Sequence, residues 1–125
     1  MNYLLDTHVF LSVLGAPEKL DPPTAALIRD PRNAIFVSAV TAVEISIKVA
    51  LGKLDAPDDL EDEIRLRGFS HLPLLYRHGV RLRSLPAHHA DPFDRMLIAQ
   101  AIDERLRIIT HDRKFAEYPI EVVWT

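Results

Sequence analysis

Two aspartates and two histidines stand close together in the segment 87–101, AHHADPFDRMLIAQA, at the start of an apolar run. Pro92 suits the first position of a helix and Asp91 suits its N-cap, so helix capping is the favoured role of Asp91. Asp94 is different, because helical periodicity places it on the apolar face of that helix. The other residues of that face are Leu97, Ile98, Ala101 and Ile102. A buried carboxylate is costly unless it is paired or binds a cation, so Asp94 is a candidate metal ligand.

Glu44 raises the same question in the segment 39–51, AVTAVEISIKVAL, which follows Ser38 as N-cap. It lies within an apolar stripe at helical spacing, formed by Val40, Val43, Ile47 and Leu51. Two structural explanations compete with metal binding: a capping box with Thr41 and an i,i+4 ion pair with Lys48. Ser38 is the better N-cap and the stripe disfavours a surface pair, but both alternatives stay open.

Asp6 directly follows the apolar run NYLL, and Asp112 follows RIIT after one intervening residue. Capping of the next helix or turn is the expected role of either residue alone. The set of four is more informative, since Asp6, Glu44, Asp94 and Asp112 come from separate elements and lie at strand ends or on apolar helix edges. Oxygen ligands without cysteine suit Mg²⁺ or Mn²⁺. Such sites support phosphoryl displacement, in which one or two ions activate water.

Short apolar strands that alternate with helices must position these residues. We expect strands at 2–5, 34–37, 107–110 and 120–124, with 70–74 as a strand or an extended link. Helices are expected at 7–14, 22–29, 39–51, 58–68, 75–83 and 92–105. The alternation predicts an α/β fold, with three α/β/α layers and a mostly parallel central sheet. The carboxyl ends of its strands, at Asp6, Ser38 and Thr110–Asp112, are the expected functional edge.

Length and composition restrict the class of protein further. The 125 residues predict one domain, residues 1–125, and the absence of cysteine excludes disulfides and thiolate metal sites. A strand-like run from Asn2 leaves no room for a signal peptide, and no apolar segment approaches the roughly 20 residues of a membrane helix. The net charge of −3 argues against broad nucleic-acid coating, but carboxylate ligands would lower the charge of a nuclease. We therefore expect a cytoplasmic protein.

Four motifs occur in a recognisable order: LLDTHVFL, VEIxIK, HxxDPFDRxLIAQA and an apolar strand ending in TxD. Together they resemble the PIN-domain family, and more narrowly the VapC-type toxins of bacterial and archaeal toxin–antitoxin pairs. The resemblance runs nearly end to end and implies an endoribonuclease that depends on Mg²⁺ or Mn²⁺. It implies that Asp6, Glu44 and Asp94 form the acidic set, with Asp112 as the fourth and more variable member. Asp91 belongs to the motif of this subgroup.

The resemblance also implies partners and a mechanism. The expected partners are RNA, a second copy of the chain and a small VapB-like antitoxin whose tail enters the active-site groove. Water activated by the ion would attack the phosphodiester in line and leave a 5′-phosphate. A PIN nuclease in RNA processing without an antitoxin is the first alternative. A catalytically silent domain that only binds a partner is the second, and the intact acidic set argues against it.

RNA binding requires positive charge despite the acidic total. The candidates for phosphate contacts are Arg95, Arg113 and Lys114, then Arg77, Arg81 and Arg83. For each of them an ordinary solvated surface is the alternative. His88 and His89 are candidates for additional ligands or proton shuttles, but their loop position favours solvated surface.

Overall fold

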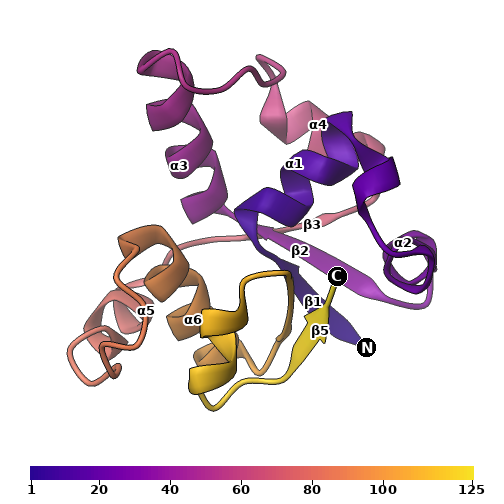
Figure 1. Ribbon diagram of the computed structural model, residues 1–125. Coiled ribbons are helices and arrows are strands. Elements are labelled where there is room, and N and C mark those ends of the chain that lie inside the picture. The colour runs from indigo at the N-terminus through magenta and orange to yellow at the C-terminus, as the bar shows by residue number, and fades with distance from the viewer.

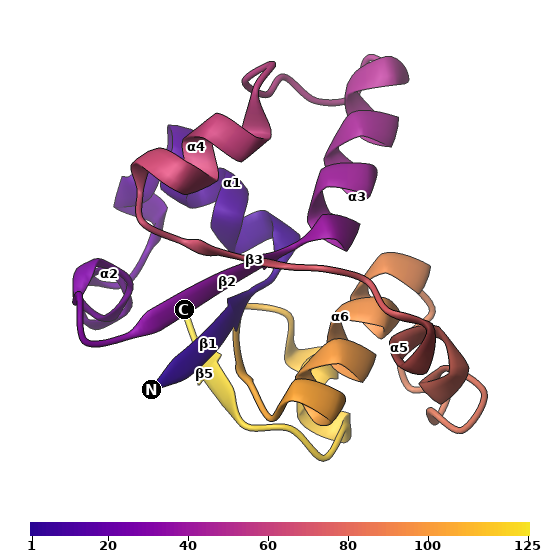
Figure 2. The same cartoon turned by 180° about the vertical axis from the view of Figure 1, so that it is seen from behind.

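The computed structural model describes all residues from Met1 to Thr125 and contains a five-stranded sheet with helices on both faces (Figures 1 and 2). The strands are β1 (Asn2–Leu5), β2 (Ala34–Ser38), β3 (Ser70–Leu72), β4 (Arg107–Thr110) and β5 (Val122–Trp124). Their order is β3-β2-β1-β4-β5, and every neighbouring pair is parallel. The predicted three-layer α/β/α fold is confirmed, and its sheet is parallel throughout.

Six α-helices connect the strands, close to the expected ranges. They are α1 (Thr7–Gly15), α2 (Pro22–Arg29), α3 (Ala39–Ala50), α4 (Leu60–Leu66), α5 (Tyr76–Arg81) and α6 (Pro92–Glu104). Helices α1, α2 and α4 lie on one side of the sheet, and α5 and α6 lie on the other (Figure 1). Two short 3₁₀ helices, Pro17–Lys19 and Arg113–Glu117, were not expected from the sequence. No helix has the length and apolar character needed to cross a membrane.

The two faces of the sheet bury alternate residues of the strands. In β1, Tyr3 and Leu5 pack with α1, α2 and α4, whereas Leu4 packs with α6. Phe10 and Ile28 are buried in the core beneath α1 and α2. Strands buried on both faces explain the continuous apolar runs of the sequence.

The expected apolar stripe of α3 is wrong as a core-facing surface. Val43, Ile47 and Leu51 are 52%, 44% and 63% exposed, and of this stripe only Val40 is buried. The buried face consists instead of Val40, Thr41, Glu44 and Ile45. The physical reason is the direction of α3, which rises from the carboxyl end of β2 away from the sheet, so that its later turns extend beyond the core (Figure 1).

The order of the strands creates one switch point. The chain proceeds from β1 outward to β2 and β3, and then returns to the other side of β1 to form β4 and β5. The switch point therefore lies between β1 and β4, which end at Leu5 and Thr110. Open parallel sheets bind ligands at such a point, beyond the carboxyl ends of the strands.

Candidate metal centre

Asp6 occupies the switch point directly after β1. Its Oδ1 accepts a hydrogen bond from the Val9 backbone N–H at 2.7 Å, which caps α1, and its Oδ2 accepts one from the Thr110 hydroxyl. The side chain is buried, and this burial raises the pKa of Asp6, against the hydrogen bonds from Thr110 and Val9. Asp6 is thus both a cap and a fixed, desolvated carboxyl group.

Glu44 lies on the buried face of α3 and is only 2% exposed. Its Oε2 accepts a hydrogen bond from the Lys48 ammonium at 2.7 Å, so the ion pair that the apolar stripe was expected to disfavour is present. Its Oε1 is buried without any hydrogen-bond partner. A buried carboxylate oxygen without a partner is unfavourable, and a bound cation would satisfy it. The residue therefore fits a metal ligand that Lys48 orients from one side.

Asp94 lies in the first turn of α6, which Asp91 caps through hydrogen bonds from the backbone N–H groups of Phe93 and Asp94, at 2.8 and 3.1 Å. Burial raises the pKa of Asp94 to about 7, and the negative charges of Asp91, Glu44 and Asp6 act in the same direction. The Asp94 carboxylate therefore shares one electrostatic environment with Asp6 and Glu44. The Asp94 side chain lies close to Asp112, which follows β4 at the carboxyl edge of the sheet.

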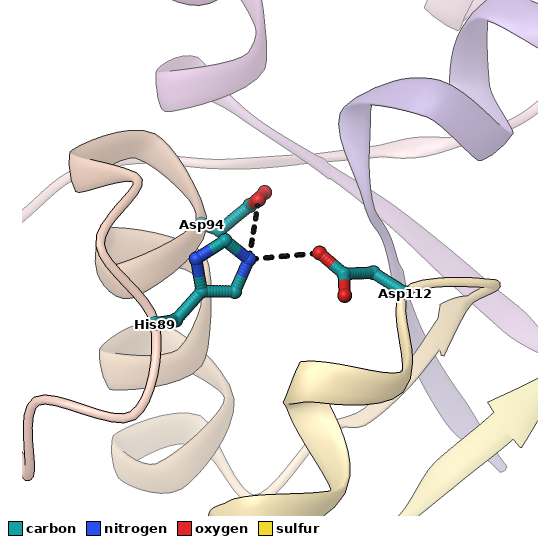
Figure 3. Close-up of side chains that lie close together, drawn as sticks. All are labelled: His89, Asp94 and Asp112. Carbon is teal, nitrogen blue, oxygen red and sulfur yellow. Dashed lines mark hydrogen bonds and ion pairs between the residues drawn. The ribbon is translucent and has the colours of Figure 1, made fainter.

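His89 joins Asp94 to Asp112 (Figure 3). Its Nε2 lies 3.1 Å from Asp94 Oδ2 and 2.8 Å from Asp112 Oδ2, and the ring is only 7% exposed. The expectation of a solvated His89 is wrong, since the loop before α6 folds inward against Phe115 and Tyr118. His88 is exposed and lies edge-on to the Tyr118 ring, with 5.3 Å between the ring centroids.

Asp112 follows β4 and caps the second 3₁₀ helix, where its Oδ1 accepts a hydrogen bond from the Lys114 backbone N–H at 3.0 Å. Burial alone would raise the pKa of Asp112, but the Lys114 N–H and His89 together lower it below its ordinary value. The Asp112 backbone N–H in turn donates to the Thr110 hydroxyl at 3.0 Å. Because that hydroxyl contacts Asp6, one hydrogen-bonded chain connects the two aspartates.

The predicted ligands come together to different degrees. The one compact group of such side chains, with ligand atoms within 4.8 Å of one another, consists of His89, Asp94 and Asp112. Asp6 and Glu44 are not members of this group and border it through Asp94. Apart from the His89 ring nitrogen, the candidate ligand atoms are carboxylate oxygens, and Lys48 is the one ammonium group paired with them. This excess of negative charge and the free Glu44 oxygen suit a hard divalent cation such as Mg²⁺ or Mn²⁺.

The predicted RNA-binding cations differ in their surroundings. The Arg95 guanidinium donates to the backbone carbonyls of Pro86 and Leu85 at 2.8 and 3.1 Å, which favours a structural role in holding that loop. Arg113 and Lys114 are exposed beside Asp112, and the Arg113 guanidinium lies 4.4 Å from the centroid of the Trp124 ring.

Among the remaining candidates, Arg77 pairs with Glu104 and Arg81 with Asp103, whereas Arg83 is exposed. These two ion pairs join α5 to α6. Arg113, Lys114 and Arg83 are the candidates that are exposed and form no ion pair with a carboxylate.

One residue that connects elements of the site, Gln100, was not predicted from the sequence. Gln100 is fully buried on α6, accepts a hydrogen bond from the Ser38 hydroxyl at 2.6 Å and donates one to the Pro73 carbonyl at 3.2 Å. It therefore joins the helix of Asp94 to the first turn of the helix of Glu44. A lone amide within the apolar face of a helix was the available signal.

The fold and the site together define a class: a three-layer α/β/α domain with buried carboxylates at the switch point of a parallel sheet. The sequence matches the PIN domain over residues 3–121, so the chain belongs to the PIN-domain family. This match runs from β1 to the residue before β5 and includes every acidic residue discussed above.

Known proteins resemble this chain over part of its sequence or in its fold. The chain is 37% identical over 65 residues to Ribonuclease VapC16 of Mycobacterium tuberculosis. The matched segment covers 49% of this chain and 46% of that protein. It thus matches less than half the length of that relative. A chain in the crystal structure of VapBC2 from Rickettsia felis bound to a promoter DNA fragment is similar in fold, with a TM-score of 0.74 and 16% identity over 100% of this chain and 99% of that one. A chain of DNA-bound VapBC from Salmonella typhimurium is similar in fold with a TM-score of 0.72 and 17% identity. The similarity covers 98% of this chain and 97% of that one.

Proposed function

We propose that this chain is an endoribonuclease of the VapC type that requires Mg²⁺ or Mn²⁺ and acts as the toxin of a toxin–antitoxin pair in a prokaryotic cytoplasm. The observation that carries the proposal is the buried, unpartnered Oε1 of Glu44 beside the desolvated carboxyl groups of Asp94 and Asp6. Membership of the PIN-domain family and the similarity to Ribonuclease VapC16 support it.

Asp6, Glu44 and Asp94 would hold the ion, and Asp112 would complete the site. When bound, a divalent ion activates water and neutralises charge at the phosphodiester. Around it the chain supplies orientation: Thr110 and the Val9 N–H hold Asp6, and Lys48 holds Glu44. Asp91 keeps its structural role as the N-cap of α6.

Exposed cations would receive the RNA at the edge of the site. Arg113 and Lys114 follow Asp112 directly, so a phosphate bound by them lies next to the carboxylates. The net charge of −3 requires such local contacts, because the protein as a whole does not attract RNA.

RNA cleavage by purified protein tests the proposal. We expect cleavage with Mg²⁺ or Mn²⁺ and none with excess chelator, and loss of at least about 100-fold in Asp94→Asn and Asp6→Asn. Asp58→Asn, an exposed aspartate outside the site, is the control for charge removal and contaminating nucleases and should cleave like the wild type. Wild-type rates in both site variants, or in chelator, would overturn the proposal.

A VapB-like antitoxin is the proposed partner, since the solved structures similar to this chain include toxin–antitoxin complexes. We expect a short neighbouring reading frame that encodes a DNA-binding protein. Co-expression of its product should suppress RNA cleavage and growth inhibition, and size-exclusion chromatography should show a complex of toxin copies with antitoxin. Full activity in the presence of that protein would favour a PIN nuclease that processes RNA without an antitoxin.

A further inference from the structure

His89 is held on every side by specific contacts. Its backbone N–H donates to the Tyr118 hydroxyl at 2.9 Å, and its ring meets the Phe115 ring edge-on, with 5.7 Å between the centroids. The ring Nδ1 accepts a hydrogen bond from the Asp91 backbone N–H at 3.1 Å. Its Nε2 faces the Oδ2 atoms of Asp94 and Asp112. The orientation of the ring is therefore fixed.

These contacts assign the proton of the imidazole. A backbone N–H can only donate, so Nδ1 uses its lone pair to accept and carries no proton. The ring proton then sits on Nε2, which is hydrogen-bonded to Asp112 Oδ2 at 2.8 Å and lies 3.1 Å from Asp94 Oδ2. A nitrogen that carries a proton has no lone pair for a cation. The compact group of His89, Asp94 and Asp112 thus contains an imidazole that donates toward the carboxylates instead of joining them as a ligand.

We propose that His89 is a positioning residue of the metal site, whose Nε2–H holds Asp94 and Asp112 side by side and never ligates the ion. This inference rests on the proposed metal-dependent function. The two carboxylates come from α6 and from the end of β4, and their negative charges repel each other. The positive end of the Nε2–H dipole, close to both carboxylates, offsets that repulsion and would keep Asp94 and Asp112 in place to hold the ion.

The chain contains a second histidine built in the same way. The buried His78 accepts a hydrogen bond on Nδ1 from the Leu75 backbone N–H at 2.9 Å, and its Nε2 lies 3.1 Å from Glu104 Oε2. This histidine joins α5 to α6, away from the four carboxylates. It therefore serves as an internal reference, with the same tautomer and no response to Mg²⁺.

Imidazole ¹⁵N–¹H correlation spectra of the wild-type protein test the proposal directly, with the His89 signals assigned by their loss in His89→Gln. We expect a protonated Nε2 and an unprotonated Nδ1 both in the free protein and at saturating Mg²⁺. A proton on Nδ1 in the free protein would overturn the proposal. Transfer of the proton from Nε2 to Nδ1 on addition of Mg²⁺ would also overturn it, because His89 would then be a ligand.

Mg²⁺ affinity of three variants, measured by calorimetry, gives an independent result. His89→Phe keeps the ring and removes the donor, and should weaken binding by about 10- to 100-fold. His89→Gln restores an N–H donor and should recover most of the affinity. The exposed neighbour variant His88→Gln should match the wild type. Wild-type affinity in a folded His89→Phe would contradict the proposal, and the spectra decide it if this variant does not fold.

The two measurements separate the role of His89 from the metal-dependent function of the site. If the wild-type protein binds Mg²⁺ and His89 changes tautomer, the metal site stands and only the role of His89 is wrong. If the wild-type protein binds neither Mg²⁺ nor Mn²⁺, the metal-dependent function is wrong, and the positioning role falls with it.

Discussion

At the scale of single residues, Asp94 shows that gathering carboxyl groups in the site disfavours their ionised form. Its carboxyl group is desolvated and lies near Asp91, Glu44 and Asp6, and its pKa is raised to about 7 as a result. His89 opposes this shift only in part. Without a cation, the ionised form of Asp94 is therefore unfavourable. Functional sites commonly hold ionisable groups whose charged forms are unfavourable in this way.

The raised pKa of Asp94 predicts a pH dependence of metal binding. An ion binds the carboxylate, whereas about half of the metal-free protein carries a proton on Asp94 near pH 7. Mg²⁺ affinity should therefore rise from pH 6 to pH 8, with release of close to one proton per ion at pH 6. Calorimetry in two buffers of different ionisation enthalpy measures the proton number. Binding without proton release at pH 6 would contradict the assignment of Asp94 as ligand.

The same pKa predicts that Asp94→Asn stabilises the metal-free protein at high pH. Between the ordinary value of 3.8 and about 7 the folded state binds more protons at Asp94 than the unfolded state, so this contribution to stability falls as pH rises. In chelator at pH 8, urea unfolding should show Asp94→Asn more stable than the wild type by roughly 1 kcal/mol or more, and the advantage should vanish near pH 4.

Asp103→Asn on the same helix provides the matched control for this stability difference. Asp103 pairs with Arg81, so its substitution should lower stability at pH 8. If Asp94→Asn is also less stable than the wild type at pH 8, the ionised Asp94 does not destabilise the folded state, and the prediction is wrong.

At the scale of the elements, Gln100 sets the relation of α6 to α3 and to the end of β3. Gln100→Leu leaves the Pro73 carbonyl without its donor and removes the acceptor of the Ser38 hydroxyl. We expect a loss of about 1–3 kcal/mol in the free energy of unfolding. Mg²⁺ affinity should also fall, because Glu44 and Asp94 lie on the two helices that this amide joins.

A double-mutant cycle with Ser38→Ala separates this connection from a simple loss of packing. If the hydroxyl and the amide act as one unit, the double variant should be less destabilised than the sum of the single variants. Additive losses in stability, or unchanged Mg²⁺ affinity in Gln100→Leu, would show that the connection does not position the site.

Arg95 holds the loop before α6, whereas Lys114 is exposed in the segment after β4, so we expect different roles for these two cations. Arg95→Met should lower stability, because it releases the carbonyls of Leu85 and Pro86. Lys114→Ala should leave stability unchanged and weaken RNA binding, with the salt dependence reduced by about one charge. Fluorescence anisotropy in an Asp94→Asn background measures binding without cleavage. The reverse pattern would make Arg95 the phosphate contact.

At the scale of the whole molecule, the sequence was sufficient to predict the fold and the edge of the sheet at which the buried carboxyl groups lie. Apolar runs of strand length that alternate with capped helices determined a parallel sheet, and Asp6 and Thr110 mark its switch point. The burial of Glu44 was foreseen for the wrong reason, since the stripe of Val43, Ile47 and Leu51 faces outward. Periodicity identifies a helix face but cannot show which face the rest of the chain covers.

His89 shows the other limit of the sequence. A histidine in a loop gives no periodicity, and its burial depends on contacts with Tyr118 and Phe115, which lie far along the chain. Long-range contacts of this kind become visible only once the elements are assembled. The capping roles of Asp6, Ser38 and Asp91, by contrast, are local and were readable directly.

The most direct test of the account is the position of an ion in crystals grown with Mn²⁺. Anomalous diffraction should show one strong peak at the switch point between β1 and β4, with carboxylate oxygens of Asp94 and of Asp6 or Glu44 at about 2.0–2.3 Å. His89 Nε2 should lie outside this distance. The absence of a peak there, or a peak coordinated by His89 without Asp6 and Glu44, would contradict the account.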